Sequence, residues 1–251
     1  PVSAQDAPKK VVFLMSGMCQ IMDSGLRLYG HPQLLGIAAS INGDDFVPYN
    51  DAIFVKLPGL GGSVSWHQDG VTHWDSPQWD QGIHGFNFQV QLYDTSARSC
   101  LWVVPGTHKD GKLDIKKLVA QNQGSEFLPD AVPLFAKAGD VTIVNRQALH
   151  ASFANTSKDT RISLTFGFHR RSSVLGACGA LSQTNDEVYD AERIDQRSRV
   201  IAVAIDARQQ FYPQEDRYSY QPMLGRETEL EFSEATWNKV IRDYNLQDLS
   251  I

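Results

Sequence analysis

Eight short stretches rich in β-branched, aromatic and aliphatic residues follow one another between residues 51 and 170, and turn residues separate each from the next. No helical periodicity alternates with them, which argues against a parallel sheet built from β-α-β units. The pattern predicts a mainly β fold whose strands form a closed or double-sheet structure. The stretches cover residues 52–57, 63–67, 85–93, 100–104, 131–136, 141–145, 149–154 and 161–169.

Helical patterns flank this β-rich region on both sides. His31-Pro32 can begin a helix that Asn42-Gly43 ends, and residues 191–210 carry a long helical pattern. No repeat and no Pro/Gly/Ser-rich linker divides the chain, so we expect a single domain over residues 1–251. Its expected parts are N-terminal helices in 1–50, a β core in 51–170 and, in 171–251, a C-terminal helical extension.

Acidic residues outnumber basic ones, 29 against 23, and the net charge of −6 argues against a nucleic-acid partner. The apolar runs are too short to span a bilayer and no signal-peptide pattern is evident, so we expect no membrane partner. Cys19, Cys100 and Cys178 are widely spaced and odd in number, which favours a reducing cytoplasm over a disulfide framework. The sequence leaves the oligomeric state open.

The segment Trp66-His67-Gln68-Asp69-Gly70 has the spacing of a metal chelate. Residues i and i+2 of a strand point to the same face, so His67 and Asp69 can both reach one metal. A third ligand is then needed, and His150 is the candidate. Two histidines and one carboxylate leave open positions on Fe(II), as oxygen chemistry requires.

The residues after His150 are typical of a site for a dicarboxylate. If residues 156–159 form the loop of a hairpin, His150, Ser152 and Arg161 share one face, whereas a loop of odd length would reverse this parity. Arg161 then lies about four residues, roughly 13 Å, along the hairpin from His150. 2-Oxoglutarate chelates iron through its keto acid end, and a guanidinium can pair with its far carboxylate in a bidentate manner. A hydroxyl, Ser152 or Ser163, would add a hydrogen bond.

Three blocks of the sequence, in this order, resemble the phytanoyl-CoA dioxygenase (PhyH) family of Fe(II)/2-oxoglutarate oxygenases. They are Trp66-His67-Gln68-Asp69-Gly70, then residues 100–109 with Pro105-Gly106-Thr107-His108, then His150-x-Ser152 followed by Arg161. The resemblance covers about residues 50–170. It departs from the family at Ala97-Arg98-Ser99, where an Asn-Gly turn is common.

The resemblance implies a double-stranded β-helix, a jelly-roll or cupin-like fold with helices packed on one sheet. It also implies the cofactors Fe(II), 2-oxoglutarate as cosubstrate and O2, with ascorbate as the reductant in vitro. The implied iron ligands are His67, Asp69 and His150, the implied clamp of the far carboxylate is Arg161, and the implied accessory cosubstrate contacts are Ser152 and Gln68, with Phe88 near the cosubstrate.

We therefore predict a dioxygenase that oxidises, and most simply hydroxylates, a C–H bond of a small organic molecule, in secondary metabolism. The family acts on many substrate classes, so the substrate stays open, as does hydroxylation against desaturation, cyclisation or epoxidation. Two alternatives are a non-enzymatic metal- or ligand-binding β-barrel and a halogenase of the same family. Halogenation needs a small residue in place of the carboxylate ligand, and Asp69 is present.

Residues 71–84 directly follow the first two candidate ligands and contain Trp74 and Trp79 among polar residues. Large aromatic side chains beside polar groups suit a loop that excludes water and orients an organic substrate. Packing of the two tryptophans onto the barrel is the alternative interpretation. We predict that this loop covers the mouth of the active site.

Overall fold

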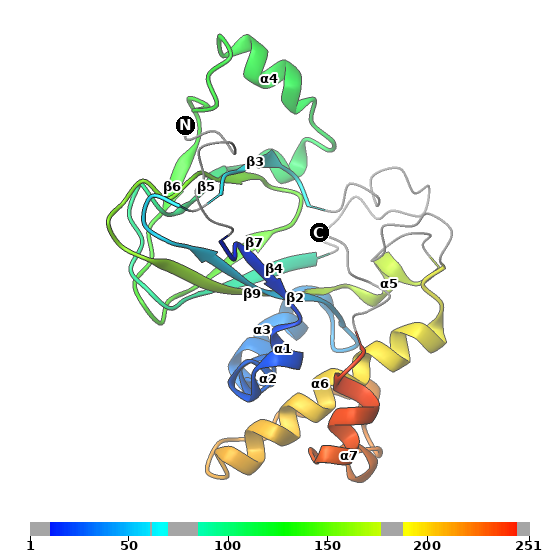
Figure 1. Ribbon diagram of the computed structural model, residues 1–251. Helices are drawn as coiled ribbons and strands as arrows, with labels where there is room; N and C mark the ends of the chain where they lie inside the picture. The colour runs from blue at the N-terminus through cyan, green and yellow to red at the C-terminus, as the bar shows by residue number, and fades with distance from the viewer. Residues whose placement is uncertain (1–10, 61, 70–84, 177–187, 245–251) are drawn as a thin grey trace. The chain divides into compact units, whose positions relative to one another are not determined.

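The computed structural model describes residues 11–60, 62–69, 85–176 and 188–244 (Figure 1). Within these residues the strands form two sheets, one of order β1-β2-β9-β4-β7 and one of order β3-β8-β5-β6. The paired strands of the four-stranded sheet are antiparallel. The strands are β1 Leu14–Ser16, β2 Val47–Lys56, β3 Val64–His67, β4 Gly85–Gln91, β5 Leu101–Val104, β6 Val132–Leu134, β7 Val141–Asn145, β8 Leu149–Ser152 and β9 Arg161–His169.

From β2 to β5 and again from β6 to β9, each strand lies in the other sheet from the strand before it, as expected for a double-stranded β-helix. β8 lies between β3 and β5, whereas β9 lies between β2 and β4. The predicted hairpin between these two strands is therefore wrong, because the chain crosses between the sheets through residues 153–160. The predicted fold class, mainly β with flanking helices, is confirmed.

Contacts between residues group the chain into two compact units. Among the described residues, the first unit comes from the stretches 11–15, 52–69 and 88–165, and it contains the whole four-stranded sheet. Leu149 and Ala151 of β8 join a core with Trp66 and with side chains of α4 (Ile115–Gln121). Since successive residues of a strand face opposite sides, His150 and Ser152 lie on the other face of β8 from this core.

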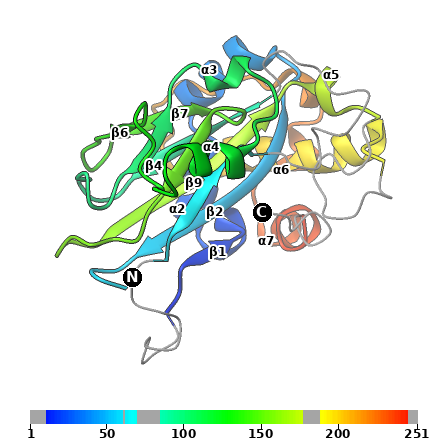
Figure 2. The ribbon, with the colours of Figure 1, turned by 90° about the horizontal axis from the view of Figure 1, so that it is seen from above.

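Helices dominate the second unit, whose described residues lie in 16–51, 85–87 and 166–244. α2 packs on the long helix α6 (Figure 1), and η4, which directly follows α7, packs on α6 as well. Figure 2 shows α7 on the same side as α6. Gly30, at the end of α2, allows a close approach because a Cβ there would lie 2.2 Å from the Ala204 carbonyl oxygen. The helices are α1 Met18–Ile21, α2 Asp23–Tyr29, α3 Pro32–Asn42, α5 Arg171–Val174, α6 Ala191–Phe211, η2 Gln221–Met223, η3 Thr228–Leu230, α7 Glu234–Thr236 and η4 Trp237–Ile241.

Most predicted helices are confirmed. α3 begins with His31 as N-cap and Pro32 in its first turn and ends before Gly43, and α6 covers the predicted helix of residues 191–210. The prediction of a helical segment over residues 1–50 is wrong in part, because β1 and the first residues of β2 lie there. These residues pair within a sheet, and that tertiary pairing outweighs local helical preference.

α4 lies in a stretch that the sequence pattern left between two strands (Figure 1). Its N-cap, Asp114, accepts a hydrogen bond from the Lys117 amide at 3.0 Å, which is a recognisable start signal. Thr107–Lys109 forms the short 3-10 helix η1 before it.

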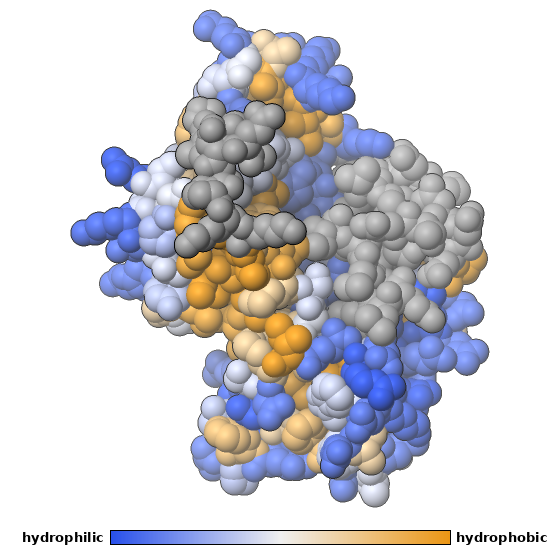
Figure 3. All heavy atoms as spheres, in the orientation of Figure 1, coloured by the Kyte–Doolittle hydropathy of each residue, from blue (hydrophilic) through white to orange (hydrophobic). Residues whose placement is uncertain are grey.

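Some apolar side chains next to β1 and β2, the first two strands of the five-stranded sheet, are exposed to solvent. Figure 3 shows an apolar area of the surface over β1, and Val12 before β1 and Leu60 after β2 are 56% and 49% exposed. These two apolar residues therefore do not belong to a core. No helix in the described part of the chain is both long and apolar enough to cross a membrane.

Candidate metal centre

Two antiparallel neighbours, β3 and β8, carry the candidate ligands. His67 is the last residue of β3, Asp69 follows two positions later, and His150 is the second residue of β8. His67 and His150 are directly paired across the two strands. The Asp69 amide donates a hydrogen bond to the Arg146 carbonyl at 2.9 Å, which fixes the backbone where the second ligand leaves the sheet.

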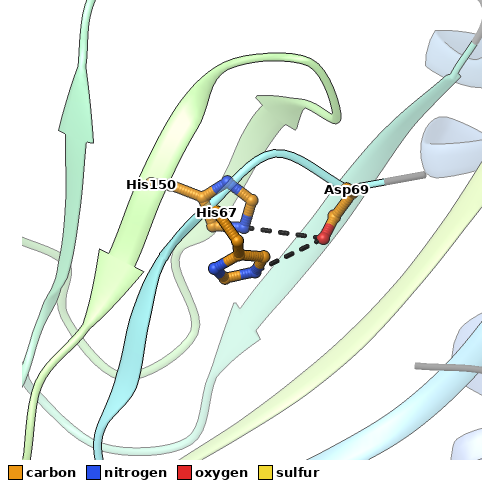
Figure 4. Close-up of side chains that lie close together, drawn as sticks. All are labelled: His67, Asp69 and His150. Atoms are coloured by element: carbon orange, nitrogen blue, oxygen red, sulfur yellow. Dashed lines mark ion pairs between the residues drawn. The ribbon is translucent and has the colours of Figure 1, made fainter. Parts of the chain in front are cut away.

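The three side chains converge. In Figure 4 the imidazoles of His67 and His150 both turn an Nε2 atom toward the Asp69 carboxylate. The Nε2 atoms lie 3.4 Å and 3.8 Å from Asp69 Oδ1, and the three ligand atoms all lie within 4.8 Å of one another. Two donors bound at about 2.0–2.2 Å to one metal are separated by at most about 4 Å, so both His–Asp distances fit a shared ion.

Backbone carbonyl groups set the tautomer of both histidines. The Nδ1 atom of His67 lies 2.8 Å from the Ser65 carbonyl oxygen, and that of His150 lies 2.8 Å from the Ala148 carbonyl oxygen. When Nδ1–H donates to a carbonyl, Nε2 is left without a proton and its lone pair is available to a metal. This donor chemistry fits a resident divalent cation.

The charges around the centre keep the carboxylate ionised. Burial alone would raise the pKa of Asp69, but Arg146 and the two histidines lower it well below its ordinary value. Burial lowers the pKa of His150. Burial also lowers the pKa of His67, but the hydrogen bond to Asp69 outweighs it, so the pKa of His67 is raised overall. An ionised carboxylate beside a neutral His150 is the state that a metal needs.

Arg161, the first residue of β9, is buried and contacts neutral side chains. Its Nη1 donates to Ser152 Oγ at 2.7 Å and its Nη2 donates to Gln89 Oε1 at 3.2 Å. No carboxylate of the residues described in the structure pairs with it, although it is only 2% exposed. Burial lowers its pKa to about 10, so the guanidinium stays positively charged at neutral pH.

Several buried polar atoms of β9 and of the neighbouring β4 have no hydrogen-bond partner within the described part of the chain. They are Arg161 Nε, Ser163 Oγ, Thr165 Oγ1 and Gln91 Oε1. Residues 161, 163 and 165 share one face of β9, since side chains alternate along a strand. Buried polar atoms in folded proteins are nearly always satisfied, so this face fits a ligand that brings its own charge and acceptors.

Gln68 lies between two ligands in sequence but is directed to the opposite face. Its Nε2 donates to the carbonyl oxygens of Gly111, at 2.9 Å, and Gln147, at 2.8 Å, and its Oε1 accepts from the Leu113 amide at 2.9 Å. Both hydrogens of the Gln68 side-chain amide are therefore bonded to backbone carbonyl oxygens. The accessory cosubstrate contact implied for Gln68 would require one of these bonds to break.

The structure brings together most of the residues expected at the site. His67, Asp69 and His150 converge, and Arg161 contacts Ser152. Phe88 is fully buried on the face of β4 opposite to Gln89. The loop predicted over residues 71–84, with Trp74 and Trp79, lies outside the described residues.

Three residues near the site were not singled out from the sequence, namely Lys56, Gln89 and Arg146. Each has a signal that could have been noticed. Lys56 is a charged residue in the apolar run 52–57, Gln89 alternates with Phe86, Phe88 and Val90, and Arg146 follows the strand that precedes His150. A charged residue inside an apolar strand is either exposed at an edge or buried for a reason.

The sheets form a double-stranded β-helix, and two histidines and one carboxylate converge on it as a candidate metal centre. The sequence profile described as "Phytanoyl-CoA dioxygenase (PhyH)" matches residues 17–163. The chain belongs to the phytanoyl-CoA dioxygenase (PhyH) family.

Known proteins extend this comparison. Phytanoyl-CoA dioxygenase 1 of Oryza sativa subsp. japonica is 31% identical over 119 residues, which cover 44% of this chain and 40% of that protein. The chain thus spans about two fifths of the length of the first curated relatives that it matches.

Solved structures share the fold. EctD from S. alaskensis with 2-oxoglutarate and 5-hydroxyectoine superposes with a TM-score of 0.55 at 17% identity, covering 74% of this chain and 71% of EctD. The 2-oxoglutarate-dependent carbocyclase SnoK from nogalamycin biosynthesis gives 0.51 at 23% identity, covering 62% of each chain.

Proposed function

We propose that this protein is an Fe(II)- and 2-oxoglutarate-dependent dioxygenase that oxidises a C–H bond of a small organic molecule. The observation that carries the proposal is the pairing of two features in one unit. One is the convergence of His67, Asp69 and His150, and the other is the buried Arg161 that has no carboxylate partner among the described residues. Membership of the PhyH family supports the same reaction class.

His67, Asp69 and His150 would hold the iron, and this donor set leaves open positions for a bidentate cosubstrate and for oxygen. Bound iron, with 2-oxoglutarate and O2, would supply the oxidising power. The protein contributes orientation, because the carbonyl groups of Ser65 and Ala148 hold the two imidazoles through their Nδ1–H groups.

Arg161 and Ser152 would hold the far carboxylate of 2-oxoglutarate. The guanidinium offers a planar pair of donors, and the orphaned Nε shows that its donor capacity is not used up. Gln89 keeps the guanidinium in place from the neighbouring strand. The same buried surroundings keep water away from the cosubstrate, which strengthens every charge interaction made there.

The substrate is proposed as a small molecule of secondary metabolism and the outcome as hydroxylation. Support for the substrate class comes from the carbocyclase SnoK of nogalamycin biosynthesis, which shares this fold. Support for hydroxylation comes from EctD, whose structure holds 5-hydroxyectoine. The buried free thiols Cys19 and Cys100 fit the proposal that the protein works in a reducing compartment such as the cytoplasm.

Succinate formation from 2-oxoglutarate in the presence of Fe(II), O2 and ascorbate tests the reaction class. We expect turnover from the wild-type protein and none above background from His67→Ala. A non-enzymatic metal-binding barrel would bind iron and form no succinate. A halogenase would give a halogenated product in the presence of chloride or bromide, and Asp69 argues against that outcome because it fills the place of the halide.

A further inference from the structure

Lys56, the last residue of β2, is a buried amine close to the Arg161 pocket. It is 1% exposed, and its Nζ donates to the carbonyl oxygens of Ser152, at 2.5 Å, and Phe153, at 2.8 Å. These carbonyl groups lie where β8 ends, so the amine connects β2 to the strand that carries Ser152. The Phe13 ring lies 5.7 Å from Nζ.

The amine has no anionic partner in the described part of the chain. Its contacts are neutral groups, namely the two carbonyl groups and the Phe13 ring. Asn155 fixes the backbone of the same residue, because its Nδ2 donates to the Lys56 carbonyl oxygen at 2.9 Å. The charged group that acts on it is Arg161 on β9, and Cys100 interacts in turn with Arg161. Burial raises the pKa of the Cys100 thiol, so Cys100 stays neutral near pH 7.

Two buried cations without an anion destabilise each other and are poorly solvated. Burial, and after it the charge of Arg161, lower the pKa of Lys56 to about 7. Orphaned polar atoms on the same face as Arg161 indicate a missing ligand with hydrogen-bonding groups of its own. An anion paired with Arg161 would remove the repulsion that Lys56 experiences.

We propose that Lys56 is a positioning residue of the cosubstrate pocket, which holds the Ser152 end of β8 and supplies a second positive charge behind Arg161 when an anionic ligand binds. This inference rests on the proposed function, because it takes the ligand to be 2-oxoglutarate. Lys56 acts through Ser152 and Arg161 and need not contact the ligand itself.

The proposal makes cosubstrate binding dependent on pH. When a carboxylate neutralises Arg161, the pKa of Lys56 rises, so the amine takes up a proton as the ligand binds. Both carboxylates of 2-oxoglutarate remain ionised between about pH 6 and about pH 9. The affinity for 2-oxoglutarate is therefore highest below the pKa of Lys56 in the ligand-free protein, which is about 7. It falls as the pH rises above that value, by at most about tenfold per pH unit.

Calorimetric titration of 2-oxoglutarate into the Mn²⁺-loaded protein, in two buffers with different ionisation enthalpies, counts the protons taken up. At about pH 7.5 we expect wild-type protein to take up a sizeable fraction of one proton and Lys56→Met to take up none. Lys158→Met removes an exposed lysine in the loop after β8 and should match wild type. If Lys56 only held the end of β8 in place, Lys56→Met would change the stability of the protein and its affinity for 2-oxoglutarate. The number of protons taken up on binding would then be the same as in wild type.

Lys56→Arg provides a second test if Lys56→Met does not fold. Arginine keeps its charge throughout this pH range, so the variant should bind 2-oxoglutarate without proton uptake and with an affinity that does not change with pH. Wild-type binding without proton uptake, or equal uptake by wild type and either Lys56 variant, would overturn the inference. A wild-type protein that does not bind 2-oxoglutarate at all would instead contradict the proposed function.

Discussion

The orientation of each candidate histidine ligand comes from a carbonyl group two residues earlier in the chain. Ser65 and Ala148 accept from Nδ1 of His67 and His150, so each Nε2 is directed to Asp69. The sequence predicts the shared face of His67 and Asp69 from strand alternation alone. It does not predict these carbonyl partners or the backbone contacts of Gln68, because they depend on the rotamers and loops of the folded chain.

Arg161→Ala should raise the concentration of 2-oxoglutarate needed for half-maximal turnover. Loss of a charge-assisted hydrogen bond costs about 1.5–3 kcal/mol, which corresponds to roughly 10- to 150-fold. Arg161→Lys should recover only part of the loss, since an ammonium cannot reproduce the planar fork that contacts Ser152 and Gln89. Steady-state kinetics of succinate formation measure this, and an unchanged requirement in Arg161→Ala would refute the assignment.

Gln68→Ala should weaken metal binding without removing a ligand. The side chain connects Gly111, Leu113 and Gln147 to the segment between His67 and Asp69. Its loss should loosen that backbone and lower metal affinity by about tenfold, the lower end of the effect of groups that orient ligands directly. Mn²⁺ titration measures the effect, and Gln121→Ala on the exposed surface of α4 serves as the control. If Gln68→Ala binds metal like wild type but loses affinity for 2-oxoglutarate, Gln68 is a cosubstrate contact after all.

At the scale of elements, the site depends on strands that are distant in the chain. The predicted strand positions are close to those observed, yet the predicted partner of β8 is wrong. Alternation within one strand is a local property, whereas pairing depends on which sheet each strand joins. Arg161 nonetheless contacts Ser152, so the contact is made between two sheets and not along one hairpin.

The packing of α2 on α6 gives a prediction for the second unit. Gly30→Ala places a Cβ 2.2 Å from a backbone oxygen of α6, so the helices must separate, at a cost of about 1–3 kcal/mol. Gly36→Ala in α3 meets nothing within 4 Å and should stabilise the protein by about 0.5–1 kcal/mol. Urea unfolding of both variants checks this, and equal effects would show that the close approach does not matter.

At the scale of the whole molecule, the fold class follows from the order of short strands and from the resemblance of three motifs, and both are local in the sequence. The division into two compact units is not predicted, because the units are assembled from stretches far apart in the chain. β2, β4 and β9 each contribute residues to both units. Folding of residues 1–251 as a single domain stays a prediction.

We propose that His67, Asp69 and His150 together hold one metal that supports the oxidation of 2-oxoglutarate. Metal content and succinate formation measured on the same samples, for wild type and Asp69→Ala, test it most directly. We expect one equivalent of Fe(II) per wild-type chain, with succinate formed in proportion to bound iron. Asp69→Ala should bind iron at least about tenfold more weakly and form no succinate above background. Equal iron binding and equal succinate formation by the two proteins would show that Asp69 is not an iron ligand.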